Sequence, residues 1–269
     1  MLSFATGVCI VPAQQGAFGG DTRGFNPLPH IERLFAQLDE VQRLAGNLKS
    51  EGAAAELRIL TVLALSYDIL PHTVLLFRVK HPNVALSIKA LHSPQIVSAL
   101  ALQEADVGFL FSPVVHSALA QEHLADGRMV CIAPKGLLTA RLLKRDSVML
   151  SDLLKVPVIG LDVLDPVGRS LNQACRESGV GLQFQITVQT HHSALALAHH
   201  GLGVALVDTC TAAAADRTRV DVLALEPLIP VPIKALMPAG KPASVTVRAF
   251  VRCFEQAVTY AAKALPNTC

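Results

Sequence analysis

The sequence predicts an α/β protein with two lobes, preceded by one long helix. Three observations lead to this prediction. A heptad pattern of apolar residues ends near residue 50, short apolar strands then alternate with helical segments as far as residue 263, and a segment around Pro230 returns the chain between the two groups of strands. Repeated β-α-β units form parallel sheets with right-handed crossovers. Two such groups joined by crossing strands leave a cleft between them, with these strands as the hinge.

Length and composition set limits on the function. The 269 residues are enough for one large or two small domains. Although 51% of the residues are hydrophobic, no apolar run approaches the roughly 18 residues that cross a bilayer, so no membrane partner is expected. The net charge is +2 and the basic residues are scattered, which neither supports nor excludes a nucleic-acid partner. The six cysteines form no Cys-x-x-Cys pair and residues 1–20 lack the basic segment of an export signal, so we expect a cytoplasmic protein.

The first 50 residues predict an irregular segment followed by a helix. Gly, Ala and Gln dominate residues 1–26, which indicates an irregular N-terminal segment. Residues 27–50 predict a helix with the narrow apolar stripe of a coiled-coil seam. We expect this helix to associate with a second copy, giving a homodimer or homotetramer. The alternative is a single amphipathic helix lying on its own domain, because the pattern is shorter than three heptads. The stripe consists of Ile31, Leu34, Leu38, Val41, Ala45 and Leu48.

From residue 57 onward, strands and helices are expected in alternation. The sequence His81-Pro82-Asn83 ends the first of these helices, as prolines do. We divide this part into lobe I, residues 57–133 and 232–262, and lobe II, residues 134–231. The expected strands are 57–64, 85–91, 105–111, 129–133, 157–161, 182–188 and 204–207. The expected helices are 69–80, 94–103, a short one at 151–154, 168–178, 193–200 and 248–263, and residues 227–236 carry the chain back between the lobes.

Several short motifs stand in a specific order and spacing along this part of the chain. They are Leu57-Arg58-Ile59, Leu70-Pro71, Phe77, His81-Pro82-Asn83-Val84, Ala105-Asp106-Val107-Gly108-Phe109, Ala198 to Val207, and Ala249-Phe250-Val251. Together they resemble the effector-binding domain of LysR-type transcriptional regulators. The resemblance covers roughly residues 57–258, and the helix before it resembles the linker helix of that family. It is most similar to regulators that respond to opines and amino acids.

This resemblance implies a two-lobed, periplasmic-binding-protein-like (type 2) domain. Such a domain binds a small effector reversibly and without a cofactor, and closure of its lobes changes how subunits pack. The expected effector is a small anionic metabolite, either a carboxylate or an amino-acid-like molecule. The family also carries a winged helix-turn-helix before its linker helix, whereas residues 1–26 show no two-helix pattern and only residues 22–27 resemble the end of a wing. We therefore expect DNA binding only if a helix-turn-helix is supplied.

The resemblance places the effector between the lobes, held by strand ends and by helix N-termini, whose unpaired N–H groups suit a carboxylate. On lobe I, Ala64 occupies the family's usual hydroxyl position, and Ser66 could replace the missing hydroxyl. Ser93 precedes Pro94, where it could bind the effector or only cap the helix. Phe111 could form a wall of the cleft. The candidates on lobe II are Val163, Leu164, Arg169, His191 and His192, although the favoured role for Arg169 is that of a solvated arginine.

Other functions fit the sequence less well. His192 and His199 would lie about 10 Å apart along a helix axis, too far to share one zinc ion, so no metal site is expected. A periplasmic-type solute-binding protein would need an export signal and no heptad helix. An enzyme on a similar lobed fold would need a nucleophile, a base and an orienting acid together. The sequence shows neither a Gly-x-Ser-x-Gly elbow nor a Walker motif.

Overall fold

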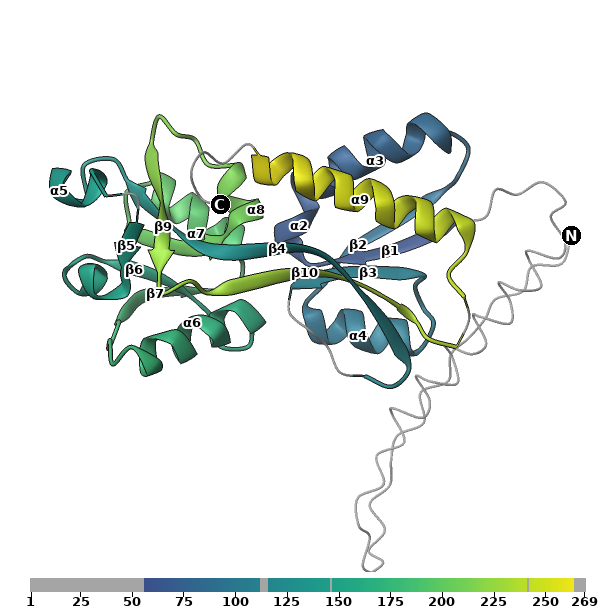
Figure 1. The fold of residues 1–269 in the computed structure, drawn as a ribbon, viewed down its shortest axis with the longest axis horizontal. Helices are drawn as coiled ribbons and strands as arrows, with labels where there is room; N and C mark the ends of the chain where they lie inside the picture. Colours follow the sequence, from purple (N-terminus) through teal and green to yellow (C-terminus); the bar gives the residue numbers. More distant parts are fainter. Residues whose placement is uncertain (1–55, 112–115, 146, 241, 264–269) are drawn as a thin grey trace, which may run out of the picture.

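A computed structural model describes residues 56–111, 116–145, 147–240 and 242–263 (Figure 1). These residues form an α/β body with two lobes, as the sequence predicts. The expected N-terminal segment 1–26 and the linker helix 27–50, with its six stripe residues, lie outside the described residues. Among the helices that the structure describes, none has both the length and the apolar character that a bilayer-spanning segment requires.

Lobe I is built on three parallel strands with β1 (Leu57–Thr61) in the middle, between β2 (Leu86–Ala90) and β3 (Val107–Phe111). Helix α3 (Ile69–Lys80) and the last helix, α9 (Val245–Lys263), lie on one side of these strands, and α4 (Ser93–Ala101) lies on the other (Figure 1).

Two aromatic contacts and one glycine show how closely these layers pack. The ring of Phe109 stacks on Phe254 of α9 with centroids 3.8 Å apart, and Phe77 of α3 meets Phe250 edge-on at 5.2 Å. On the other face, a Cβ added at Gly108 would lie 2.6 Å from the Ile96 side chain of α4. Only glycine therefore allows α4 to pack this closely on β3.

Two long strands connect the lobes. The strand order is β2-β1-β3-β10-β4-β8-β6-β7, in which β4 (Leu119–Pro134) and β10 (Pro230–Pro238) are antiparallel neighbours. Strand β4 pairs with β10 as far as Arg128 and with lobe II strands from Met129 onward. Strand β4 therefore passes from lobe I to lobe II at Met129, a few residues before residue 133, which was the expected end of the first part of lobe I.

Lobe II repeats the parallel arrangement. Strand β6 (Val158–Leu161) lies between β7 (Phe184–Val188) and β8 (Val204–Asp208). Helices α6 (Pro166–Glu177) and α7 (His191–His199) lie on opposite sides of these strands (Figure 1). The remaining elements are α5 (Ala140–Leu143), β5 (Ser147–Met149), the 3-10 helix η1 (Leu150–Lys155), α8 (Thr209–Ala213) and β9 (Val220–Glu226), which pairs with β4 and β5.

The structure corrects several expected boundaries. The strand expected over 57–64 ends at Thr61, and α2 (Leu63–Ser66) follows it. Helices α6 and α7 begin two residues earlier than expected, because Asp165 caps α6 and Thr190 caps α7 through their side-chain oxygens. The strand expected at 129–133 is only the second half of β4, and β9 and α8 were not predicted. The earlier start of α7 makes His191 its first residue.

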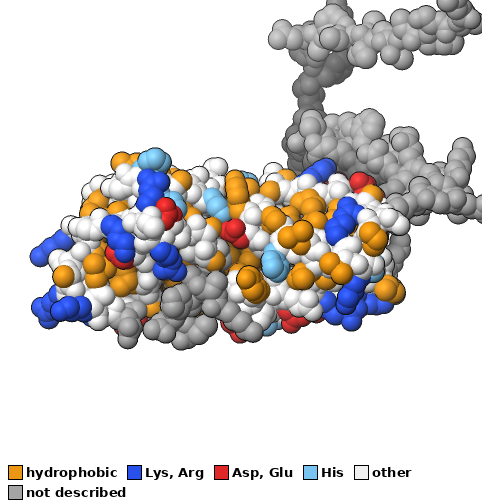
Figure 2. Space-filling model, turned by 90° about the horizontal axis from the view of Figure 1, so that it is seen from above, with side chains coloured by type: hydrophobic (Ala, Val, Ile, Leu, Met, Phe, Trp, Pro, Cys, Tyr) orange, Lys and Arg blue, Asp and Glu red, His pale blue; other side chains and the backbone are white. Residues whose placement is uncertain are grey.

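Charged side chains are unevenly spread over the face shown in Figure 2. Lys and Arg gather toward the two ends of the molecule, and the middle of this face carries apolar, acidic and histidine side chains. The described residues on this face therefore form no continuous basic surface of the kind that contact with a nucleic-acid backbone requires.

Candidate functional site

A cavity lies between the lobes, and both lobes contribute to its wall. Its empty volume is about 340 Å³, including the part open to solvent. The cavity lies beyond the carboxyl ends of β1 and β3, where open α/β sheets bind their ligands. The described residues that line it are Val62, Leu63, Ala64, Leu91, His92, Ser93 and Phe111 from lobe I, and Asp165, Gln189, Thr190 and His191 from lobe II.

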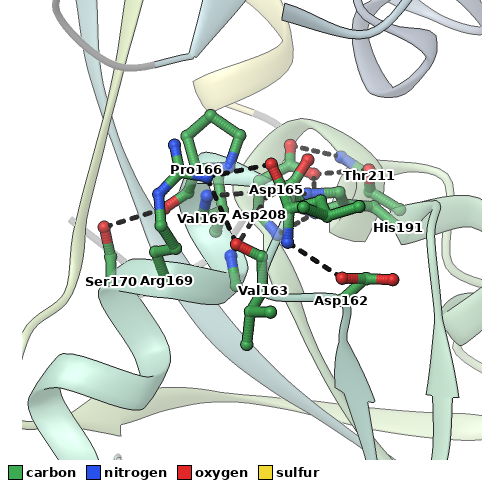
Figure 3. Close-up of polar contacts among 12 residues, drawn as sticks. Asp162, Val163, Asp165, Pro166, Val167, Arg169, Ser170, His191, Asp208 and Thr211 are labelled. Carbon is green, nitrogen blue, oxygen red and sulfur yellow. Dashed lines mark hydrogen bonds and ion pairs between the residues drawn. The ribbon is translucent and has the colours of Figure 1, made fainter.

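The most unusual side chain in this wall is His191, which lies between two carboxylates (Figure 3). Its side chain is 3% exposed. Its Nδ1 lies 2.8 Å from Oδ2 of Asp208, and its Nε2 lies 3.7 Å from Oδ1 of Asp165. Asp208 is 1% exposed and accepts two further hydrogen bonds, from the backbone N–H and the hydroxyl of Thr211 at 2.9 and 2.6 Å.

The surroundings of His191 determine its protonation. Nδ1 also lies 3.2 Å from the backbone nitrogen of Asp208, but one ring nitrogen cannot accept that proton and also donate to the carboxylate. The shorter contact favours donation to the carboxylate. Burial lowers the pKa of a histidine, but Asp208 and Asp165 outweigh it and raise the pKa of His191 to about 9. Burial also raises the pKa of the carboxyl groups of Asp165 and Asp208. The effect of His191 is opposite and larger, so each pKa lies below its usual value. Near neutral pH, His191 is therefore an imidazolium.

The second nitrogen of this imidazolium has no hydrogen-bond partner among the described residues. Nε2 of His191 is buried and unpaired there, since 3.7 Å to Asp165 is longer than a hydrogen bond. A buried donor without an acceptor is unfavourable, and more so when it is charged. Both His191 and Asp165 line the cavity. The cavity wall thus contains a buried charged donor, which an acceptor reaches only if the groups around it move.

Three other predicted residues also reach the cavity. Ala64 and Phe111 line it, and the ring of Phe111 lies 5.7 Å from that of His191. Ser93 lines it as the first residue of α4, with Pro94 second. Because the N-cap position belongs to His92, the capping role suggested for Ser93 is wrong.

The remaining predicted residues lie outside this cavity. The hydroxyl of Ser66 donates to the carbonyl of Leu63 at 2.7 Å within α2, and Ser66 does not line the cavity. The guanidinium of Arg169 donates to the carbonyl of Val163 at 3.2 Å (Figure 3) and to that of Leu164 at 3.0 Å. The side chains of Val163 and Leu164 are exposed. Arg169 therefore fixes the loop before α6.

His192 lies between the lobes but not in the cavity wall. Its ring stacks on Tyr67, which follows α2 in lobe I, with centroids 4.0 Å apart and planes 27° apart. Both of its ring nitrogens are buried, with no hydrogen-bond partner in the described part of the chain, and burial lowers the pKa of His192. Neighbouring histidines thus have different roles, since His191 faces the cavity and His192 packs against the other lobe.

The sequence analysis missed the two carboxylates that surround His191. Asp165 followed by Pro166 is a helix-start signal, because Asp is a preferred N-cap and Pro is tolerated at the first helical position. Asp208 directly follows an apolar strand, where a polar residue faces the ligand side of a parallel sheet. Both signals were available, but the pairing of these residues with His191 depends on how α6, α7 and β8 come together.

No metal site accompanies these groups in the part of the chain that the structure describes, where no three His, Cys, Asp or Glu residues are arranged as ligands. A further hollow lies within lobe I alone, around Arg58 and Asp106. Its principal charges already form an ion pair of 3.2 Å. The cavity between the lobes is therefore the better candidate for a ligand.

Comparisons with known proteins agree with this architecture. Residues 50–259 match the family model described as the LysR substrate binding domain. The chain is 23% identical to the transcriptional activator protein LysR of Escherichia coli over 246 residues, covering 91% of this chain and 77% of that protein. It is 24% identical to the regulatory protein NocR of Agrobacterium tumefaciens, with 91% and 76% coverage. It is also 24% identical to the regulator DgcR of a Pseudoalteromonas species, of which it spans 61%.

Solved structures show the same fold. The LysR family regulator CbnR superposes with a TM-score of 0.66 at 17% identity, covering 86% of this chain and 78% of CbnR. The regulatory domain of CcmR from Synechocystis, solved in complex with 2-PG, gives a TM-score of 0.65 at 17% identity, with 75% and 96% coverage.

Proposed function

Because this chain belongs to the LysR family of transcriptional regulators, we propose that it is the effector-binding part of a regulator that senses a small carboxylate-bearing metabolite between its lobes. The relatives named above are transcriptional regulators. We therefore place this chain in the cytoplasm, where it acts as an oligomer. Its contact with DNA requires a helix-turn-helix.

The observation that carries the proposal is the unpaired Nε2–H of His191. A carboxylate oxygen is the strongest common acceptor for an imidazolium, and a charge-assisted hydrogen bond in a buried site is about twice as strong as a neutral one. Ser93 faces the same cavity from lobe I. A ligand bound to both would connect the lobes, and closure around it would change how subunits pack.

An enzymatic function is less well supported by this site. A histidine that activates a protein nucleophile needs that nucleophile within hydrogen-bond reach. Among the described residues, the side-chain contacts of His191 are to the two aspartates and to aromatic Phe111, with no hydroxyl or thiol bonded to it. We propose that the cavity binds its ligand without transforming it.

Thermal melting with small carboxylates tests the proposal. A ligand that binds only the folded chain raises Tm by mass action, and calorimetry or a dye is needed because the chain has no Trp. His191→Gln keeps a polar side chain and removes the positive charge. We expect it to reduce the ligand-induced rise in Tm, whatever its effect on the unliganded Tm.

His200→Gln is the matched control, because His200 is exposed at the other end of α7. It should leave the ligand-induced rise unchanged. An equal rise in the parent chain and in His191→Gln would contradict the assignment of His191 as the carboxylate donor.

A further inference from the structure

The cavity presents a second charged group beside the imidazolium. We propose that the site is built for a zwitterionic α-amino acid with an uncharged side chain, whose ammonium group is held by Asp165, and not for a simple organic anion. This inference rests on the proposed function, in which His191 receives the carboxylate. It identifies Asp165 as the residue that determines which class of carboxylate is bound.

The carboxylate of Asp165 is only partly used by the protein. Its Oδ1 accepts the backbone N–H groups of Val167 and Gly168 at 2.7 and 3.3 Å. Among the described residues, no hydrogen bond reaches its Oδ2. The side chain is 20% exposed and lines the cavity. One oxygen is thus committed to capping α6, and the other is available to a ligand donor.

The charges around the cavity do not favour an anion. The described lining contains no Lys or Arg, and its titratable residues are Asp165, His191 and His92. Asp208 lies directly behind His191. One imidazolium is therefore shared by two carboxylates, which leaves a net negative charge. A simple carboxylate bound at Nε2 would gain one favourable contact but would be repelled by the nearby carboxylate of Asp165. An ammonium group on the same ligand would instead be attracted to Asp165.

The spacing fits the same ligand. Nε2 of His191 lies 3.7 Å from Oδ1 of Asp165, and the available Oδ2 belongs to the same carboxylate. In an α-amino acid, the ammonium nitrogen and a carboxylate oxygen are joined through one carbon and lie about 3 Å apart. The two ligand groups can therefore pair with the two protein groups side by side. The walls beside them include the apolar side chains of Val62, Leu91 and Phe111, which suit an uncharged ligand side chain.

Matched pairs of ligands test this inference by calorimetric titration. Each pair consists of an amino acid and the same acid without its amino group, such as alanine and propionate, and the panel covers the twenty common amino acids. Titrations at about pH 6, below the ordinary histidine pKa, favour the protonated form of His191. We expect at least one uncharged amino acid to bind about tenfold or more tightly than its deaminated partner, because a charge-assisted contact is gained.

Two variants isolate the role of Asp165. Asp165→Asn preserves the helix cap, since Asn caps as well as Asp, and removes the charge. It should weaken amino-acid binding about tenfold or more and reduce the preference over the deaminated acid. Asp162→Asn is the control, because Asp162 lies in the same loop, accepts a bond from the backbone N–H of Leu164 at 2.9 Å and does not line the cavity. It should leave both affinities unchanged.

The outcomes separate this inference from the proposed function. If deaminated acids bind as tightly as amino acids, or Asp165→Asn keeps the preference, the zwitterion assignment is overturned, while a dependence on His191 would leave the carboxylate site standing. If neither class binds at about 10 mM, where even weak ligands register, both are overturned.

Discussion

The charged state of His191 makes the stability of the protein depend on pH in a definite direction. The pKa of His191 is about 9 in the folded chain and about 6.5 when unfolded. A group whose pKa is higher in the folded chain stabilises the fold. This stabilisation is fully present at pH values below the pKa of the unfolded chain, and it is lost as the pH rises through the pKa of the folded chain. At 1.36 kcal/mol for each pKa unit, it amounts to at most about 3 kcal/mol, of which about 2 kcal/mol is lost between pH 6 and pH 8.

Urea denaturation across this pH range measures the effect. Other groups titrate in the same experiment. Burial lowers the pKa of His192 and His199, so their contribution increases stability as pH rises. Burial also raises the pKa of the thiols of Cys131, Cys175 and Cys210, which lowers stability above about pH 8.5. The informative quantity is therefore the difference between the parent chain and His191→Gln below pH 8.

This difference should shrink by about 2 kcal/mol between pH 6 and pH 8, because only the parent chain loses the protonated imidazole. At pH 6, His191→Gln should be less stable by about 3 kcal/mol or more, since it leaves Asp208 buried beside a neutral side chain. Parallel pH profiles for the two chains would show that His191 is not an imidazolium in the folded state, and the reasoning about its free donor would fail with it.

Three further changes test other parts of the account. Leu38→Glu should weaken self-association, because it places a charge in the predicted apolar seam, and sedimentation showing a pure monomer of the parent chain at micromolar concentration would refute the seam. The Tyr67–His192 stack should give a coupling free energy of about 0.5–1.5 kcal/mol in a double-mutant cycle measured by urea denaturation, and a coupling near zero would show that it does not hold the lobes together. Gly108→Ala should destabilise the chain by about 1–3 kcal/mol in the same assay, because its methyl group crowds α4. The control Gly181→Ala, whose methyl group enters open space, should lie within about 0.5 kcal/mol of the parent. Equal effects of the two substitutions would contradict close packing of α4 on β3.

Much of the fold follows from local patterns, because most strands and helices are short apolar or amphipathic segments with recognisable ends. The parallel strands β3 and β6 are continuous apolar runs, and β8 is apolar up to Asp208, as expected for strands buried on both faces. The first half of β4 has mostly exposed side chains. Its structure depends on pairing with β10, far along the chain, so no local pattern indicates it.

The candidate site was predicted less completely for the same reason. His191, Ser93 and Phe111 stand next to strand ends or helix starts, and local signals indicate such positions. The pairing of His191 with Asp165 and Asp208 joins three elements that are separated in the sequence. Ser66 and Arg169 have suitable chemistry, but their hydrogen bonds are to carbonyl groups of their own segments.

The proposed ligand is a carboxylate that enters between the lobes and binds the free nitrogen of His191. A crystal structure with the tightest-binding acid of the ligand panel would locate it. We expect a carboxylate oxygen within about 3 Å of Nε2 of His191, with the ligand in contact with Ser93 of the other lobe. A ligand bound elsewhere, with Nε2 still unpaired, would contradict this expectation.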